Sequence, residues 1–176
     1  MFTLITSWYH EPNKARRAEL LYCLNRNLEH SLIKHVWLIV EEETDIQLHH
    51  KIRVKYFERR PVFMDMVKQA NALKGLSIIA NTDIYFDDSL GMAKYLKPTQ
   101  CYALTRWDTR ADGTLMFYNK EYSQDAWIIN APIAFAGGAY SPGKPGCDNK
   151  FAWELADAGL SVSNPSKTIK ACHLHL

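Results

Sequence analysis

Along the first half of the chain, short apolar runs alternate with stretches in which apolar residues recur at helical spacing. The runs predict strands at residues 2–7, 36–40, 52–57 and 76–83. Between them, apolar residues recur at helical spacing after Asn13 and after Pro61, which predicts two helices. This alternation favours an α/β fold with a mainly parallel sheet flanked by helices, in which the carboxyl ends of the strands lie along one edge.

The second half has a less regular pattern. It predicts a short helix at 87–96, a strand at 101–105, a polar loop at 106–114, a turn-rich loop at 141–146, and a helix that Asp148 opens and Gly159 closes. The chain has 176 residues, of which 47% are hydrophobic, and it shows neither a repeat nor a linker. We therefore expect a single domain.

Charge and cysteine content bear on several classes of protein. Lys and Arg number 21 against 19 Asp and Glu, so we expect no general attraction for nucleic acid or an anionic membrane. The chain begins without a basic leader, and no apolar run approaches the ~20 residues of a membrane span, so we expect a soluble, cytoplasmic protein. The four cysteines are far apart, which favours reduced, mostly buried thiols over a zinc site.

The most informative stretch is the end of the strand predicted at residues 76–83, where an apolar run gives way to Asn81, Thr82 and Asp83. Ligand sites in open α/β sheets lie where strands end, and a carboxylate there is a hard oxygen ligand for a phosphate-bound cation. Asp83 could instead cap the following turn. The triplet resembles the Asp-x-Asp element of GT-A-fold glycosyltransferases, with the neutral Asn81 in the first acidic position.

The order of further motifs adds to the resemblance. A Gly-rich segment at 136–139 precedes Asp148 at a helix start, where this family often has the base that takes a proton from the acceptor hydroxyl. Asp148 could equally be an ordinary N-cap. Asp125, beside Trp127, could accept hydrogen bonds from sugar hydroxyls while the indole stacks on the ring. The alternative is that Trp127 is a core residue and Asp125 belongs to a turn.

Two late histidines complete the metal site that the resemblance implies. His173 and His175 would lie on one face of an extended C-terminal segment, and GT-A enzymes often complete the metal shell with a late histidine. Asp83 with His173, or with His175 as second choice, would hold Mn²⁺, which suits an imidazole better than Mg²⁺ does. The alternative is a frayed tail that carries two surface histidines.

The resemblance also assigns contacts to the nucleotide. Arg60 precedes a predicted helix and is the candidate for the diphosphate, unless it is a solvated surface residue. The other residues assigned to the nucleotide are Thr6, Ser7, Glu41, Asn71, Asn81 and Thr82. Residues 1–97 would form a nucleotide-binding half and residues 98–176 an acceptor half of one GT-A-like domain.

The resemblance implies a metal-dependent glycosyltransferase of the hexosyltransferase type. It would move a sugar from a nucleoside diphosphate sugar, with a UDP-sugar favoured, to an acceptor hydroxyl, with Mn²⁺ or Mg²⁺ as cofactor. One alternative is a nucleotidyltransferase-like metal enzyme, which usually needs a Gly-rich basic loop that residues 8–12 do not supply. The other is a non-catalytic module that binds a nucleotide sugar. The aromatic content is compatible with a sugar groove and with a homo-oligomer interface.

Overall fold

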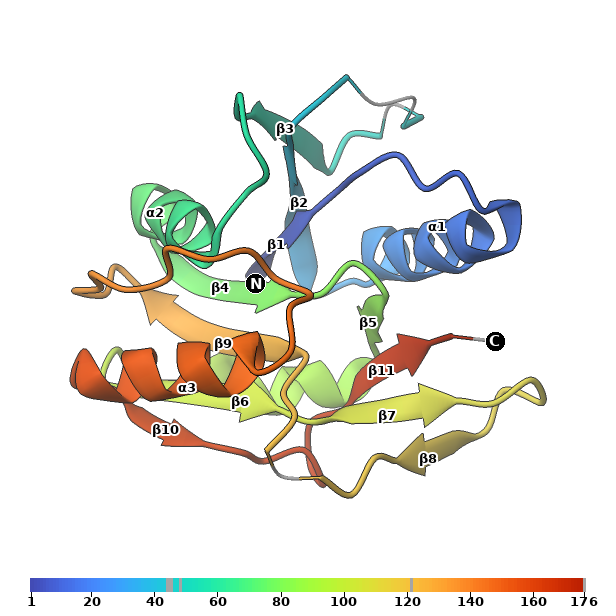
Figure 1. Cartoon of the computed structure of the whole chain (residues 1–176). Helices are drawn as coiled ribbons and strands as arrows, with labels where there is room; N and C mark the ends of the chain where they lie inside the picture. The colour runs from blue at the N-terminus through green and yellow to red at the C-terminus, as the bar shows by residue number, and fades with distance from the viewer. Residues whose placement is uncertain (44–45, 48, 121, 176) are drawn as a thin grey trace.

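The strands of the chain pair into a seven-stranded and a four-stranded sheet, which Figure 1 shows with the helices packed around them. The structure is a computed structural model and describes residues 1–43, 46–47, 49–120 and 122–175. The first half contains β1 (Phe2–Ser7), α1 (Lys14–Glu29), β2 (Ile33–Val40), β3 (Ile52–Tyr56), α2 (Phe63–Leu73), β4 (Gly75–Ala80), β5 (Ile84–Phe86) and the 3₁₀ helix η1 (Asp88–Tyr95). The second half contains β6 (Gln100–Leu104), β7 (Arg106–Thr109), β8 (Leu115–Phe117), β9 (Ala126–Ala131), α3 (Cys147–Asp157), β10 (Ser161–Ser163) and β11 (Ala171–Leu174).

The large sheet has the strand order β10-β6-β9-β4-β1-β2-β3. Its β4, β1, β2 and β3 are parallel, as are β6 and β10, while β9 runs antiparallel between β6 and β4. This confirms the mainly parallel sheet predicted from the sequence. Because β1, β2 and β4 point the same way, the residues that follow them meet at one edge of the sheet.

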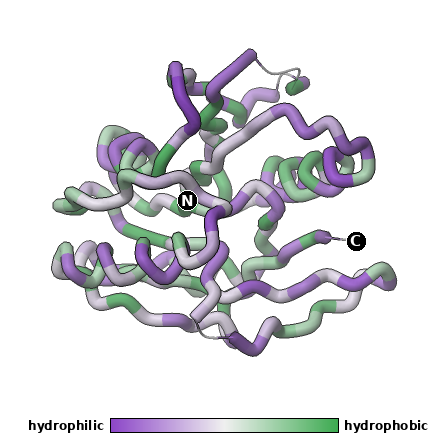
Figure 2. The backbone as a smooth tube through the Cα atoms, viewed as in Figure 1, coloured by the Kyte–Doolittle hydropathy of each residue, from purple (hydrophilic) through white to green (hydrophobic). Residues whose placement is uncertain are grey.

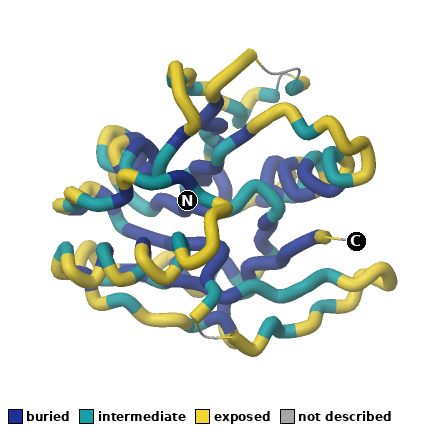
Figure 3. The backbone as a smooth tube through the Cα atoms, in the orientation of Figure 1, coloured by how far each residue is buried: buried dark blue, intermediate teal, exposed yellow. Residues whose placement is uncertain are grey.

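Helices cover both faces of this sheet, so its central strands are apolar on both sides. Leu4 packs in one core cluster with α1 and η1, and its neighbour Ile5 packs in a second cluster with α2 and α3. Ile78 and Ile79 of β4 divide between the two clusters in the same way. Figure 2 shows hydrophobic residues along the central strands, and Figure 3 shows the same strands buried beneath exposed outer loops.

The small sheet has the order β5-β11-β7-β8 and brings the end of the chain back against its middle. β11 pairs antiparallel with β5 and parallel with β7, so that His173 lies opposite Ile84 on one side and Asp108 on the other. The polar loop predicted at residues 106–114 is therefore wrong, because β7 occupies residues 106–109. Its polar residues fit a strand since β7 is only partly buried and takes its backbone hydrogen bonds from β11 and β8.

Other boundaries differ in smaller ways from those that the sequence predicts. β4 ends at Ala80, so Asp83 lies in the turn before β5 rather than at the end of a strand. β9 was not predicted, because its short apolar run lacks the alternation of a half-buried strand and periodicity alone does not separate such a run from a buried helix segment. The start of α1 is confirmed, since the Asn13 side chain accepts hydrogen bonds from the backbone of Ala15 and Arg16. Within the described residues, no helix combines the length and the hydrophobicity needed to cross a membrane.

Candidate functional site

A cavity of about 550 Å³ opens where β1, β2 and β4 end, and its volume is in the range of small-molecule sites. Mostly polar and aromatic side chains from six separate segments line it. They are Ser7, Trp8, Tyr9, His10, Arg16, Leu20, Glu41, Glu42, Arg60, Pro61, Asn81, Thr82, Asp83, Pro142 and Gly143. The edge of the sheet predicted from strand polarity is thus the edge that carries the cavity.

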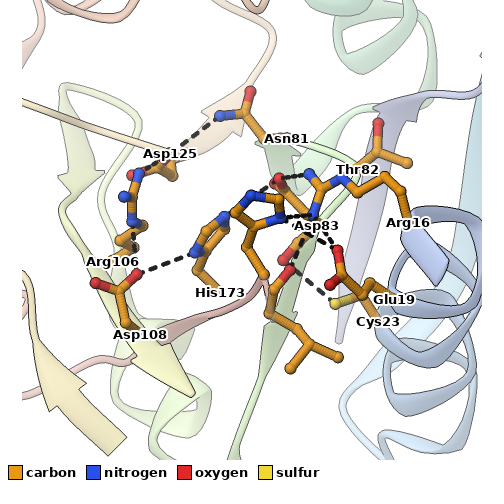
Figure 4. A network of polar contacts seen from close by, with 12 residues as sticks. Arg16, Glu19, Cys23, Asn81, Thr82, Asp83, Arg106, Asp108, Asp125 and His173 are labelled. Carbon is orange, nitrogen blue, oxygen red and sulfur yellow. Dashed lines mark hydrogen bonds and ion pairs between the residues drawn. The ribbon is translucent and has the colours of Figure 1, made fainter. Parts of the chain in front are cut away.

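Asp83 of the cavity lining lies beside His173, which is not part of the lining, although 90 positions separate the two in the sequence (Figure 4). The Nε2 atom of His173 is 3.3 Å from Oδ2 of Asp83. The other ring nitrogen, Nδ1, is 3.0 Å from Oδ1 of Asp108 on β7. The pairing of β11 with β5 and β7 therefore fixes the imidazole between two carboxylates, with Nε2 directed at Asp83.

The charges of this pair support each other. Burial raises the pKa of Asp83, but the hydrogen bonds and charges of His173 and Arg16 outweigh burial, so its pKa lies below the ordinary value. Burial lowers the pKa of His173, but Asp83 and Asp108 outweigh it, so the imidazole pKa is raised. Asp83 is thus held as an anion in a largely buried position, and an ionised carboxylate is the form that can bind a cation.

Arg16 in the first turn of α1 contacts the same carboxylate. Its Nη2 atom bonds Oδ2 of Asp83. Its Nη1 atom lies 2.7 Å from Oε2 of Glu19 and donates to the carbonyl of Leu174 at 3.1 Å. His175 Nδ1 is 3.0 Å from the same Nη1 atom. The guanidinium therefore joins α1 to the turn before β5 and to the end of β11.

Asp125 lies next to this network but outside the cavity lining. Its Oδ1 atom accepts a hydrogen bond from Asn81 at 3.1 Å and is 3.6 Å from a guanidinium nitrogen of Arg106. The other oxygen, Oδ2, is buried and has no hydrogen-bond partner among the described residues. Burial raises the pKa of Asp125 above its ordinary value, although Arg106 and His173 oppose the rise. Asp125 is therefore a candidate for a proton-transfer or hydroxyl-binding role.

Asp148 lies in the first turn of α3, after Gly146 at the N-cap. Its Oδ2 atom accepts a hydrogen bond from the backbone of Gln124 at 3.1 Å, which places it beside the segment that carries Asp125. Trp127 does not stack over a sugar site, because it is 1% exposed and packs against Phe63 and Phe151 in the core. For Trp127 the core alternative is therefore correct.

Four of the nucleotide candidates that the sequence assigned to strand ends lie in the cavity lining. They are Ser7, Glu41, Asn81 and Thr82. The Thr82 hydroxyl donates to the Ser7 carbonyl at 2.8 Å, which holds the ends of β1 and β4 together. Thr6 is 5% exposed and lies beneath the lining.

The surroundings of Arg60 and the position of Asn71 differ from those that the sequence indicated. Arg60 lines the cavity and donates to the Pro142 carbonyl at 3.1 Å, but the start of α2 is no free anion site. The backbone N–H groups of Phe63 and Met64 are already bonded to the carbonyls of Tyr140 and Gly138. The Asn71 amide holds the backbone of Ile133 through both of its polar atoms, so the structure does not bring Asn71 to the cavity.

The residues present fit a divalent ion only in part. Over the ranges that the structure describes, no three His, Cys, Asp or Glu side chains are arranged to hold an ion. Asp83 Oδ2 and His173 Nε2 are nevertheless close enough to share one ion, and Asp108 orients the imidazole as second-shell carboxylates do. Such a pair suits an ion that completes its coordination with water and a ligand phosphate. His175 is 65% exposed and bonds Glu19 and Arg16 rather than Asp83.

The sequence did not point to several residues of the site. Arg16 reads as one of many surface cations on an amphipathic helix, and only the fold turns it toward Asp83. Asp108 could be paired with Arg106 from the sequence, as the structure shows, but its contact with His173 was hidden by the polar loop predicted over β7. Trp8 and Tyr9 follow directly after β1, and their position at a strand end is the signal that could have identified them.

Comparison with known proteins identifies the fold. No protein-family model and no curated protein matches the chain. Solved structures do match, over 99% of the chain. S. aureus TarS in complex with UDP-GlcNAc has a TM-score of 0.64 at 14% identity. The mannosyltransferase PcManGT from Pyrobaculum calidifontis, in complex with GDP-Man and Mn²⁺, has a TM-score of 0.57 at 11% identity. GalNAc-T7 with UDP, GalNAc and Mn²⁺ has a TM-score of 0.59 at 10% identity.

These neighbours are glycosyltransferases of the GT-A fold, and the chain has that fold. It covers 58%, 56% and 43% of their chains, respectively, so it spans about half of their length.

Proposed function

We propose that the chain transfers a hexose from a nucleoside diphosphate sugar, with a UDP-sugar favoured, to an acceptor hydroxyl. The observation that carries the proposal is the buried pair of Asp83 and His173 beside a cavity at the carboxyl edge of the sheet. The GT-A fold adds support, because TarS, PcManGT and GalNAc-T7 were crystallised with UDP-GlcNAc, with GDP-Man and with UDP. A cavity with both acidic and basic lining residues suits a ligand that has polar and anionic parts.

Asp83 and His173 would hold Mn²⁺ or Mg²⁺, and the mixed oxygen and nitrogen donors favour Mn²⁺. The bound ion would offset the negative charge that develops on the departing nucleoside diphosphate. Asp108 keeps the His173 proton on Nδ1 and so leaves Nε2 directed at the site. Arg60, at the rim near Pro142, supplies a second cation for the diphosphate.

Two carboxylates are candidates for the chemistry on the sugar side. Asp148 would take the proton from the acceptor hydroxyl, which gives direct displacement with inversion. Asp125 accepts a hydrogen bond from Asn81 of the cavity lining, and its buried, unpartnered Oδ2 atom would accept one from a sugar hydroxyl once donor binding opens a path to it. The backbone bond from Gln124 to Asp148 keeps the two acids in one region.

Calorimetric titration of the protein with UDP and with GDP, each with and without Mn²⁺, tests the proposal. We expect binding of one nucleotide that depends on Mn²⁺. Asp83→Asn keeps the shape of the side chain but removes the charge, and should weaken Mn²⁺-dependent binding by about 100-fold or more, since a charged metal ligand is lost. Asp112→Asn, at an exposed hairpin, is the matched control and should bind like the wild type.

Two results would contradict the proposal. One is the absence of binding to both nucleotides, and the other is unchanged Mn²⁺-dependent binding in folded Asp83→Asn. If binding is found, Mn²⁺-dependent hydrolysis or transfer of the matching nucleotide sugar separates an enzyme from a non-catalytic module. A release of pyrophosphate from nucleoside triphosphate would instead favour a nucleotidyltransferase.

A further inference from the structure

Arg16 is the residue of the cavity whose role the proposed function leaves open. The N-cap Asn13 accepts a hydrogen bond from the backbone of Arg16 at 3.2 Å, which fixes the turn that carries the side chain. The guanidinium lies in the cavity lining and reaches Asp83 through Nη2 and Glu19 through Nη1. Figure 4 shows it on the side of Asp83 that faces α1, with His173 on the other side.

Arg16 and His173 meet at a single atom. Nη2 of Arg16 and Nε2 of His173 both contact Oδ2 of Asp83. A divalent ion held by Asp83 Oδ2 and His173 Nε2 would lie close to the guanidinium, and like charges at such distances repel strongly in a largely buried site. The ion and the Arg16 contact therefore exclude each other at this oxygen.

The guanidinium of Arg16 would keep one partner and gain space in the cavity if it left Asp83. Glu19, which is 7% exposed, holds Nη1 at 2.7 Å and can keep the base of the guanidinium in place. The Arg16 side chain is 21% exposed and lines the cavity, so a small rotation turns Nη2 into that space. A diphosphate in the cavity offers it pairs of anionic oxygens, to which the planar guanidinium can donate two hydrogen bonds at once.

We propose that Arg16 is the resident counter-ion of Asp83 and that a divalent ion binds by displacing it, with the donor diphosphate accepting the released guanidinium. This inference rests on the proposed function. It predicts that metal and nucleotide bind cooperatively: the metal alone competes with Arg16, and the nucleotide removes the competitor. Because such coupling is reciprocal, each ligand raises the affinity of the other by the same factor.

A purely structural ion pair makes a different prediction. If Arg16 only ties α1 to the turn before β5, its loss lowers the stability of the protein and leaves metal affinity unchanged or weaker. Under the exchange mechanism its loss raises the affinity for metal alone. The sign of the change in metal affinity separates the two.

The test is a titration with Mn²⁺ alone, read as the loss of the free Mn²⁺ signal in electron paramagnetic resonance, and then a repeat with saturating UDP or GDP. We expect Arg16→Gln to bind Mn²⁺ alone at least about tenfold more tightly than the wild type, the factor that one charged hydrogen bond is worth. In the wild type the nucleotide should raise Mn²⁺ affinity by at least about tenfold, and in Arg16→Gln by clearly less. Lys14→Gln removes the same charge from an exposed position on the same turn and should match the wild type.

Equal Mn²⁺ affinity in the wild type and in folded Arg16→Gln overturns the exchange and leaves the proposed function intact. If neither protein binds Mn²⁺, with or without either nucleotide, the metal assignment fails and the exchange fails with it. Should Arg16→Gln not fold, Arg16→Lys keeps the charge but loses the fork that grips two anions, and it should bind Mn²⁺ alone more tightly than the wild type does. Weaker binding by Arg16→Lys overturns the proposal.

Discussion

At the scale of single residues, the site is a row of side chains in which basic and acidic groups alternate. The dashed lines of Figure 4 connect members of this row. Its members in order are Arg16, Asp83, His173, Asp108, Arg106 and Asp125. Each inner acidic group lies between two basic groups, and each inner basic group between two acidic ones, so every inner member has a polar partner on both sides. The row ends at Asp125, whose Oδ2 atom has no partner within the described part of the chain.

The stability of Asp125→Asn, compared with that of the wild type, should increase as the pH rises. Burial raises the pKa of Asp125, so the folded state disfavours its ionised form. Ionisation therefore costs stability as the pH rises through the folded-state pKa, and Asn pays no such cost. We expect the difference in unfolding free energy to grow by about 1 kcal/mol, the low end of the cost of an unpaired buried polar atom. This is roughly 2–4 °C in melting temperature for a chain of this size.

The measurement is a thermal melt of both proteins from about pH 3 to about pH 7, a range that begins below the ordinary pKa of an aspartate and extends well above it. Asp157→Asn, at an exposed position near the end of α3, controls for the loss of one negative charge. A constant difference between Asp125→Asn and the wild type across this range would show that Asp125 carries no ionisation penalty.

At the scale of elements, the segment before α3 ties α2 and α3 to each other. Gly138 donates its N–H to Oε2 of Glu154 on α3 at 2.8 Å, and its carbonyl accepts from Met64 on α2 at 3.0 Å. The hydroxyl of Tyr140 donates to the same Glu154 oxygen at 2.8 Å. This segment leads directly into Pro142 and Gly143 of the cavity lining, so its position sets one wall of the site.

Gly138→Ala should destabilise the protein far more than Gly113→Ala. Both glycines have a positive φ, of 77° and 81°. A Cβ at Gly138 would lie 2.7 Å from the backbone nitrogen of Met64, whereas a Cβ at Gly113 would meet nothing within 4 Å. We expect Gly113→Ala to cost about 1 kcal/mol for the backbone conformation, and Gly138→Ala about 3 kcal/mol because a clash with backbone is added.

Urea or thermal unfolding of the two variants gives this comparison directly. Since the two backbone conformations are alike, the difference between the variants isolates the steric contact with Met64. If Gly138→Ala and Gly113→Ala destabilise the protein equally, α2 and the segment around Gly138 can move apart at little cost to make room for the Cβ.

The elements that could be predicted from the sequence are those marked by a local pattern of apolar residues or by a local helix-end residue. The runs of β1, β2 and β4 are apolar on both faces, and Asn13 and Gly159 mark helix ends by local chemistry, so all of these could be found. β7 could not, because its partly polar residues become a strand only through pairing with β11, which lies about 65 positions later. Asp83 was identified by its place after β4, whereas Arg16 was not, since nothing local distinguishes it from other cations on α1.

At the scale of the whole molecule, one sheet and its two core clusters run through both halves of the chain. Leu4 of β1 shares a cluster with Ile128 of β9, and Phe63 of α2 shares the other with Phe151 of α3. β4 and β9 pair directly across the boundary at residues 97–98. Neither half buries its core without the other, so residues 1–97 and 98–176 are expected to form one cooperative unit.

The protein should therefore unfold in one transition, and the donor nucleotide should move that whole transition upward. Far-UV circular dichroism reports the sheet and helices. Tryptophan fluorescence reports the five tryptophans, among which the buried Trp8 and Trp127 lie in different clusters. We expect both melting curves to coincide. Nucleotide with Mn²⁺ at about 100 times its Kd should add about 2.7 kcal/mol, or roughly 5–11 °C, to both curves alike. A chelator should reverse the shift, because under the proposed function the ion would link the nucleotide to Asp83 and His173. Two separate transitions, or a nucleotide-induced shift in only one of the two melting curves, would mean that the cavity belongs to a subdomain that folds independently of β9 and α3.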